Sequence, residues 1–412
     1  MNNVKYKNTP LGELPFDWST QNIEDVCEIL DSKRVPLNKQ EREAMQGDIP
    51  YYGANGVLDF IDKNLFDEPL ILMAEDGGYF SEYNTRPIAY KISGKSWVNN
   101  HAHILKPLEN EVFDWVYYNL VHKNILPFIN GGTRAKLNQK DLKKLPIAYP
   151  PIKEQQKIAA ILSSVDEAIE KTEQIIEQTE TVKKGLMQEL LTKGIGHTEF
   201  KALPFGKIPS TWKTVSINDV ADINPENLSS KTDDDYELEY IDIASIENNS
   251  ITETSGYLFK DAPSRARRKV KSGDIIVSTV RPYLRGFAYI NEKYNEAVCS
   301  TGFAVLRSNN ECYSNFLYQV ILSERFVNYL ISNMTGSNYP AVKADDIKVY
   351  EFALPPKGEQ IKISNILSVY QNKIESELNK LTKLNKIKKG LMQQLLTGKV
   401  RVPIDEKEEV PS

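Results

Sequence analysis

The sequence is poor in cysteine and has no long apolar run. Its three cysteines, Cys27, Cys299 and Cys312, stand at irregular spacings that fit neither a disulfide framework nor a zinc site. We expect them to be buried thiols in a reducing cytoplasm. No apolar run approaches the roughly 20 residues needed to span a bilayer, and the first residues lack the apolar core of a signal peptide. A soluble, cytoplasmic protein is therefore expected.

The chain also lacks the signatures of enzymes that act on nucleotides or DNA. It has no Walker loop, no His-Glu-x-x-His and no Gly-x-Ser-x-Gly. The Asn/Asp-Pro-Pro-aromatic loop of base methyltransferases is absent, and so is the Pro-Asp followed by Glu-x-Lys of common restriction nucleases. Gly194-x-Gly196 follows a predicted helix instead of a strand, so it is a poor match to a nucleotide-binding turn. We expect no catalysis by this chain and no cofactor or metal bound to it.

Positive charge is scarce overall. The 412 residues carry a net charge of −5, which by itself argues mildly against a nucleic-acid binder. An electrostatic footprint is a local patch, however, so its distribution matters more than the sum. The length suits two to four domains.

An internal repeat organises the chain. Residues 11–29 recur as residues 205–223, at an offset of 194. Residues 150–163 recur as 355–368, and 183–192 recur as 388–397, both at an offset of 205. The segments between these matches differ in sequence and length. A duplication that kept its frame while its globular parts diverged explains this pattern.

A long helix is predicted after each Pro-Pro pair. About 40 residues without proline follow each pair, and their apolar residues recur at steps of mostly three and four, which predicts a coiled-coil seam on a rod of roughly 60 Å. The seam residues include Ile158, Leu162, Ile169, Leu186 and Leu190 in the first helix and Ile363, Leu367, Ile374, Leu391 and Leu395 in the second.

Charge favours pairing of the two helices with each other. Residues 152–192 carry five lysines and eight acids, whereas 357–399 carry nine lysines and three acids. The alternative is that each helix packs on its own globular module. Gly185 and Gly390, in the repeated Lys-Lys-Gly-Leu-Met-Gln, are expected to allow close helix contact or to mark a bend.

These features predict an α+β protein made of two mixed α/β domains in tandem, each followed by a long helix. The predicted boundaries are 1–150 and 197–355 for the domains, 151–196 and 356–400 for the helices, and 401–412 for a flexible tail. Strands are predicted over 69–74, 273–280 and 301–306, and helices over 113–121 and 315–331.

The second domain contains a cluster of basic residues opposed only by Asp274. Phosphates attract such cations, and arginine also forms paired hydrogen bonds to guanine. The candidates for DNA contact are Arg265, Arg267, Arg268, Lys269, Arg281 and Arg285, with Tyr283 between the last two and a polar loop of Ser337, Asn338 and Tyr339. The corresponding loop of the first domain, at an offset of 205, contains Arg134 and Lys136. For any single arginine, the alternative is an ordinary solvated charge.

The first domain offers polar residues in turn-rich segments. Tyr51, Asn55 and Asp76 are candidates for base contact, as are Asn99 and His101. His101 and His103 would share one face of a strand, which raises the possibility of a metal site. Two histidines without a third ligand are more often structural or DNA-contacting, so no metal is expected.

As a set, these features resemble the specificity subunits of type I restriction–modification systems, over nearly the whole chain. The resemblance rests on Pro-x-x-Trp at each domain entrance (Pro15 to Trp18 and Pro209 to Trp212), on the Pro-Pro…Glu-Gln…Ile…Ile-Leu opening of each helix and on the paired Lys-Lys-Gly-Leu-Met-Gln-x-Leu-Leu-Thr. Residues 273–282 and 301–306 also look like segments of such recognition domains.

The resemblance implies that each domain reads one half of a split, asymmetric DNA site, and that the helices form an antiparallel coiled coil that sets the spacing. Two modification subunits, which bind S-adenosylmethionine and methylate adenine, would dock on the chain. Restriction subunits that use ATP and Mg²⁺ would join them. Two alternatives remain open: a protein-interaction scaffold, and a DNA-recognition part that serves another defence system.

Overall fold

The computed structural model describes residues 5–130, 135–204, 206–336 and 340–403, so Arg134, Ser337, Asn338 and Tyr339 lie outside the described residues. The chain forms two compact units. Unit 1 comprises residues 1–173 and 379–412, and unit 2 comprises residues 174–378. Each unit therefore contains one globular domain, part of the first long helix and part of the second. Among the described residues, no helix combines the length and the apolar character needed to cross a membrane.

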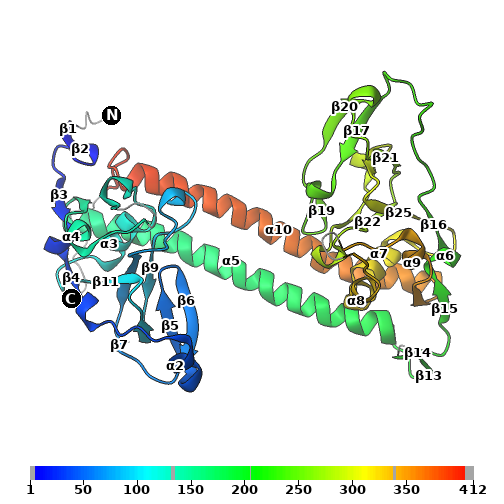
Figure 1. Ribbon diagram of the computed structural model, residues 1–412, viewed down its shortest axis with the longest axis horizontal. Helices are drawn as coiled ribbons and strands as arrows, with labels where there is room; N and C mark the ends of the chain where they lie inside the picture. The colour runs from blue at the N-terminus through cyan, green and yellow to red at the C-terminus, as the bar shows by residue number, and fades with distance from the viewer. Residues whose placement is uncertain (1–4, 131–134, 205, 337–339, 404–412) are drawn as a thin grey trace. The chain divides into compact units, whose positions relative to one another are not determined.

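Two four-stranded sheets form the body of unit 1 (Figure 1). The strand orders are β4-β11-β8-β9 and β6-β5-β10-β7. The first sheet comprises β4 (Cys27–Ile29), β8 (Leu70–Ala74), β9 (Ala89–Ile92) and β11 (Ala102–Pro107). The second comprises β5 (Gln46–Gly53), β6 (Gly56–Ile61), β7 (Phe66–Asp67) and β10 (Lys95–Val98).

Strand β8 is buried on both faces, as its unbroken apolar sequence predicts. Because side chains alternate along a strand, Ile71 and Met73 face one way and join the core around Trp115 of helix α3 (Phe113–Leu120). Leu70 and Leu72 face the other way and pack in a separate apolar cluster. The strand thus connects the two halves of the unit's core.

Unit 2 repeats this topology, with orders β16-β25-β22-β23 and β20-β17-β24-β21. The first sheet comprises β16 (Ala221–Ile223), β22 (Ile275–Ser278), β23 (Phe287–Tyr289) and β25 (Phe303–Ser308). The second comprises β17 (Glu237–Ile241), β20 (Ser255–Leu258), β21 (Ala266–Lys269) and β24 (Val298–Ser300). The pairs β5–β10 and β17–β24 are parallel in their respective units. The predicted tandem of two mixed α/β domains is confirmed.

Shorter elements also match between the units. Both contain an antiparallel pair at the domain entrance and a second pair beside the long helix, β1-β2 and β3-β12 in unit 1 and β13-β14 and β15-β26 in unit 2. Their bounds are β1 (Tyr6–Thr9), β2 (Gly12–Pro15), β3 (Ser19–Asn22), β12 (Pro146–Tyr149), β13 (Phe200–Leu203), β14 (Gly206–Pro209), β15 (Lys213–Ser216) and β26 (Glu351–Leu354). The hairpin β18 (Ile246–Glu247) and β19 (Ser250–Ile251) is part of unit 2.

The remaining short helices are α1 (Ile23–Val26), α2 (Lys39–Ala44), α4 (Gln139–Lys143), α6 (Ile217–Val220), α7 (Ser314–Leu322), α8 (Glu324–Ser332) and α9 (Ala344–Lys348). The single helix predicted over 315–331 is wrong, because the chain breaks at Ser323. This residue has an extended backbone (φ −66°, ψ 145°), and its Oγ accepts a hydrogen bond from the Phe326 amide. Serine favours such an N-cap, which starts a new helix.

The long helices α5 (Ile152–Lys193) and α10 (Lys357–Leu395) pair in an antiparallel manner within each unit (Figure 1). In unit 1, the start of α5 lies beside the end of α10: Lys388 Nζ is 2.6 Å from Asp166 Oδ1, and Leu395 shares a core with Ile158 and Leu162. In unit 2, the end of α5 lies beside the start of α10, where Leu190 shares a core with Ile363. The predicted helix pairing is confirmed.

The burial of the seam residues shows that the ends of the long helices also pack on globular domains, which was the alternative to pairing of the helices with each other. Seven seam residues are buried, and six of them lie at the helix ends: Ile158, Leu162, Leu190, Ile363, Leu367 and Leu395. All six belong to the same apolar clusters as the globular domains. Ile374 is buried outside these clusters, and Ile169, Leu186 and Leu391 are half-buried. The helix ends therefore pack on a domain and on each other at once.

A carboxylate at the start of each long helix, buried for Glu154 and half-buried for Glu359, fixes the domain entrance. Trp18 Nε1 donates a hydrogen bond to Glu154 Oε2 in unit 1, and Trp212 Nε1 donates to Glu359 Oε2 in unit 2, both over 3.0 Å. The glutamine that follows each glutamate donates to the carbonyl of the first proline of its Pro-Pro pair, over 2.9 Å. These contacts explain why the Pro-x-x-Trp and Pro-Pro…Glu-Gln segments recur together.

A basic side chain from beyond the end of the other long helix completes each junction. Arg401, which follows α10, donates to both carboxylate oxygens of Glu154 over 2.7 and 2.8 Å, and it also binds Asp17. In unit 2, His197 follows α5, and its Nε2 lies 2.8 Å from Glu359 Oε1. Each junction thus joins the start of one helix to the end of the other.

Glycine ends both long helices where the chain passes the domain entrance. Gly194 and Gly398 have left-handed φ values of +66° and +64°, which glycine adopts without strain. A Cβ on Gly398 would lie 2.4 Å from the Pro15 ring. By contrast, a Cβ on Gly185 or Gly390 would meet no atom within 4 Å, so the expected close helix contact at these glycines is wrong.

One substitution within α10 and one just beyond its end should therefore have opposite effects. We expect Gly398→Ala to lower the free energy of unfolding by about 2 kcal/mol, because alanine is strained at positive φ and collides with Pro15. We expect Gly390→Ala to raise it by up to about 1 kcal/mol, because alanine favours a helix interior and the space is open. Denaturant unfolding followed by circular dichroism measures both, and equal effects would contradict the helix-end role.

Candidate nucleic-acid interface

Four candidate residues of unit 1 come together where strand β8 ends. Asp76 Oδ1 lies 2.8 Å from His101 Nδ1, and the His101 amide donates to Asn99 Oδ1 over 2.8 Å. The backbone of Asp76 forms a bridge with Lys136. His101 and Lys136 are about two-fifths exposed, whereas Asp76 and Asn99 are largely buried. The buried Asp76 and Asn99 therefore fix the positions of the exposed His101 and Lys136.

The turn between β5 and β6 reaches the same place. Asn55 is exposed in this turn, and its Nδ2 donates to the carbonyl of Gly77, next to Asp76. Tyr51 differs from its prediction, because its side chain is only 1% exposed. Its hydroxyl accepts a hydrogen bond from the Leu37 amide, and the Arg42 guanidinium lies over its ring. Tyr51 therefore stabilises the hairpin and does not form part of the exposed surface.

A buried ion-pair network supports this surface. His103 Nδ1 lies 2.6 Å from Asp31 Oδ2, and Nε2 lies 2.8 Å from the Leu137 carbonyl. Both ring nitrogens therefore face oxygen atoms of the interior, which hold the ring in place. Glu75 pairs with Arg34 at 2.5 Å and with Lys136 at 2.8 Å. The exposed Lys136 is thereby fixed to the interior.

The donor atoms of Asp31, Glu75 and His103 lie within 4.8 Å of one another, a spacing that would suit a metal ion. Arg34 and Lys136 already pair with Glu75, however, and His103 already uses both ring nitrogens. The carboxylates are thus balanced by protein cations, and the network needs no ion to balance them. His103 has a structural role, whereas His101 reaches the surface.

Unit 2 has the same framework but different side chains at the corresponding place. The Thr279 amide donates to the Gly302 carbonyl, as the Glu75 amide donates to the His101 carbonyl in unit 1. Val280 forms a bridge with Ala341, as Asp76 does with Lys136. The same backbone frame therefore presents other chemical groups in each unit.

Two exposed arginines stand at this place in unit 2. Arg281 follows Val280 directly, and its amide donates to the Pro340 carbonyl. Its φ of +47° is uncommon for a residue with a side chain and costs about 1 kcal/mol, so the fold imposes it. The carbonyl of Arg265 accepts a hydrogen bond from the Thr301 amide, next to Gly302. Arg265 and Arg281 thus flank one edge of the two sheets.

Much of the remaining basic cluster is bound within the chain. Arg285 Nη2 is 2.5 Å from Glu324 Oε2, and Lys269 Nζ is 3.0 Å from Glu296 Oε2. Arg267 lies over the ring of Phe259 at 4.6 Å. The sequence shows only Asp274 within the cluster, and the acids Glu296 and Glu324 that pair with it come from other segments.

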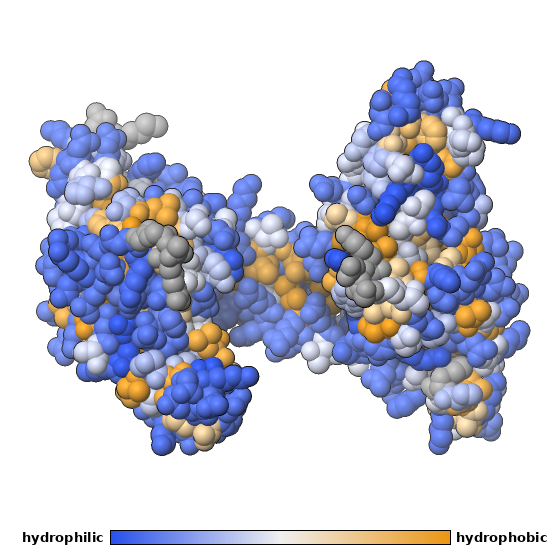
Figure 2. Space-filling view, in the orientation of Figure 1, coloured by the Kyte–Doolittle hydropathy of each residue, from blue (hydrophilic) through white to orange (hydrophobic). Residues whose placement is uncertain are grey.

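Arg268 and Tyr283 differ in their surroundings. Nε and Nη1 of Arg268 are buried without a hydrogen-bond partner among the described residues, and burial lowers the pKa of its guanidinium. Tyr283 is 44% exposed in the 3₁₀ turn Pro282–Leu284, directly after Arg281. Tyr283 therefore extends the exposed edge, whereas Arg268 lies beneath it. Figure 2 shows that both units present mostly hydrophilic side chains on the viewed face.

The buried network makes unit 1 sensitive to acid. Burial alone would raise the pKa of Glu75, but hydrogen bonds from Lys136 and Arg34 lower it below its ordinary value. The pKa of Asp31 is lowered in the same way, against burial, by the hydrogen bond from His103. A carboxyl whose pKa is lowered on folding stabilises the fold above its unfolded pKa of about 4, and this contribution is lost as the pH falls.

We therefore expect unit 1 to lose stability below about pH 4–5. Glu75→Gln should lower the free energy of unfolding at pH 7 by about 1–3 kcal/mol, because two cations lose their partner. The variant should also lose less stability between pH 5 and pH 3. Glu43→Gln, which changes an exposed ion pair with Lys39, is the matched control with little effect. Equal pH profiles for the two variants would contradict this prediction, and denaturant midpoints measured at each pH provide the test.

Comparison with known proteins places both domains in one family. The family model of the type I restriction modification DNA specificity domain matches residues 15–181 and again residues 209–389. The putative type I restriction enzyme MjaX specificity subunit of Methanocaldococcus jannaschii is 27% identical, over 96% of this chain and 97% of its own length. The MjaVIII specificity subunit of the same organism is 26% identical, over 94% of each chain. The crystal structure of the S subunit of a type I restriction-modification system from M. genitalium has the same fold, with a TM-score of 0.63, 17% identity and coverage of 96% of this chain and 97% of that one. The chain belongs to the family of type I restriction–modification DNA specificity proteins.

Proposed function

We propose that this chain is the non-catalytic DNA-recognition subunit of a cytoplasmic type I restriction–modification complex. Each domain reads one half of a split, asymmetric DNA site. One observation carries the proposal: the two units share strand order and helix junctions, yet they differ in the polar residues at the same exposed place. Unit 1 presents His101 and Lys136 there, and unit 2 presents Arg265 and Arg281. A conserved frame with different side chains suits two different half-sites.

The paired helices set the spacing of the half-sites and provide a docking surface for two methyltransferase subunits. The repeated Lys-Lys-Gly-Leu-Met-Gln segments supply that surface twice, which suits two identical partners. S-adenosylmethionine belongs to those partners, and ATP and Mg²⁺ belong to restriction subunits that join the complex. This chain contributes DNA contacts and geometry, and it binds no cofactor.

The exposed arginines of unit 2 provide a first test. We expect Arg265→Ala combined with Arg281→Ala to weaken DNA binding by the assembled complex at least tenfold at about 0.1 M salt. The slope of log affinity against log salt should fall by about two, because two phosphate contacts are lost. Lys260→Ala removes a lysine of the same domain that already pairs with Asp235, and it serves as the control. Fluorescence anisotropy measures both, and an unchanged salt slope would exclude phosphate contacts by these arginines.

Changing helix length provides a second test. Four residues inserted after Glu173 in α5 and four after Leu378 in α10 add about one turn, roughly 6 Å, to both helices. We expect the spacer of the methylated site to lengthen by about one or two base pairs while both half-sites stay the same. Sequencing of methylated DNA from cells that contain the complex, compared with the wild type, reads both features. Altered half-sites with an unaltered spacer would refute the proposed roles of helices and domains.

A further inference from the structure

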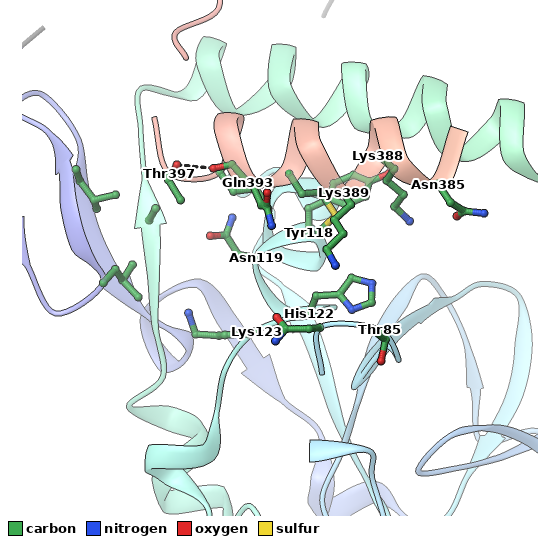
Figure 3. Close-up of a pocket in the computed structure, with 16 residues that line it drawn as sticks. Thr85, Tyr118, Asn119, His122, Lys123, Asn385, Lys388, Lys389, Gln393 and Thr397 are labelled. Atoms are coloured by element: carbon green, nitrogen blue, oxygen red, sulfur yellow. Dashed lines mark hydrogen bonds between the residues drawn. The ribbon is translucent and has the colours of Figure 1, made fainter. Parts of the chain in front are cut away.

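A cavity of about 690 Å³ lies in unit 1, between the last turns of α10 and the end of α3. Figure 3 shows Lys389 extending from α10 toward His122 on the opposite wall. Asn119 and Lys123 line the same cavity farther to the left in this view. The lining includes three lysines, Lys123, Lys388 and Lys389, and no aspartate or glutamate. The cavity is therefore rich in hydrogen-bond donors and positively charged.

The charges in the cavity are only partly balanced. Lys388 pairs with Asp166 of α5. Among the described residues, Lys123 and Lys389 have no ion-pair partner. Burial lowers the pKa of Lys123 to about 8, which reflects the cost of holding this charge without a counter-ion. The pKa of His122 is lowered by burial and by the neighbouring Lys388 and Lys389. An anion in the cavity would relieve each of these unfavourable interactions.

Unit 2 contains a place that corresponds to this cavity, and there the charges are balanced by other residues of the chain. Helices α3 and α7 correspond at an offset of 201, because each opens with an equivalent bond, Val116 N to Val112 O and Leu317 N to Tyr313 O. At this offset, Lys123 corresponds to Glu324.

The repeat also makes Lys389 of α10 the counterpart of Lys184 of α5. In unit 2, Glu324 pairs with Lys184 at 3.2 Å and with Arg285 at 2.5 Å. Unit 1 therefore replaces the acid of this ion pair with a lysine.

We propose that the cavity of unit 1 binds a small anion with two or more phosphate groups, whose oxygens take the place of the Glu324 carboxylate of unit 2. Its volume is in the range of ligand sites for small molecules, roughly 300–1,000 Å³. One acidic side chain of a partner would fill only a small part of it, and a DNA duplex is too wide to enter. Identical partners that dock on the repeated helix segments do not account for Lys123, because its counterpart in the other copy, Glu324, has the opposite charge.

Titration of the full-length chain with inorganic pyrophosphate and with adenosine triphosphate tests this site. Isothermal titration calorimetry at low salt should detect one bound anion per chain. We expect Lys123→Glu, which copies the acid of unit 2, to weaken binding at least tenfold. Lys184→Met, which removes the counterpart of Lys389 in unit 2, should leave the affinity within twofold of the wild type. Without the anion, Lys123→Glu should melt at the same temperature as the wild type or higher, because it removes a buried cation that has no counter-ion.

Several outcomes would overturn the proposal. One is the absence of binding beyond that seen with sodium chloride of equal ionic strength, and another is equal weakening by Lys123→Glu and Lys184→Met. Displacement of pyrophosphate by a short DNA duplex, with the same dependence on Lys123, would assign the site to the DNA backbone instead. If Lys123→Glu fails to fold, Lys389→Met replaces it with the same expectation. The methylated-site measurement on the wild type is independent of this cavity, so failure here leaves DNA recognition intact.

Discussion

The structure depends on one carboxylate at the start of each long helix, which is buried in unit 1 and half-buried in unit 2. Removing a carboxylate from water costs several kcal/mol unless it is fully paired. Glu154 meets this requirement with the Trp18 indole and the Arg401 guanidinium, and Glu359 meets it with Trp212 and His197. These partners come from a domain entrance and from the segment beyond the other helix. Because each carboxylate binds partners from both places, its hydrogen bonds fix the domain entrance, the start of one helix and the end of the other relative to one another.

This constraint explains what the repeat preserved. The tryptophan, the Pro-Pro pair and the Glu-Gln pair act together, because each glutamine also satisfies the carbonyl of the preceding proline. A change in any one leaves a buried polar group without its partner. The basic partner differs between the copies, arginine in one and histidine in the other, since either side chain offers an N–H to the carboxylate. The surfaces away from the junction carry no such requirement, and there the two copies differ.

The sequence predicted the features that depend on local pattern and failed where distant residues meet. Helix pairing and the two domains follow from periodicity and from the repeat. Asn55, Asp76, Asn99, His101 and Lys136 come together because they stand at the ends of neighbouring strands. The acids that bind Lys269 and Arg285 lie 27 and 39 positions away, so the cluster looked more exposed than it is. The burial of Tyr51 depends on Leu37 and Arg42, which no periodicity connects to it. Gly194 seemed a poor nucleotide motif, and its left-handed φ shows a helix end instead.

The comparison of the two copies separates the backbone frame from its charges. Helices α3 and α7 open with an equivalent backbone hydrogen bond, yet a lysine follows one of them where a glutamate follows the other. In unit 2 the glutamate is satisfied by two cations of its own unit. In unit 1 the lysine lines a cavity together with two further lysines and no acidic side chain. A duplicated backbone can therefore carry opposite charges at corresponding positions. One copy balances the charge with ion pairs from its own chain, and in the other copy solvent or a ligand takes that role. The same reasoning applies to the exposed strand ends, where the frame is held by backbone hydrogen bonds and the side chains are free to differ.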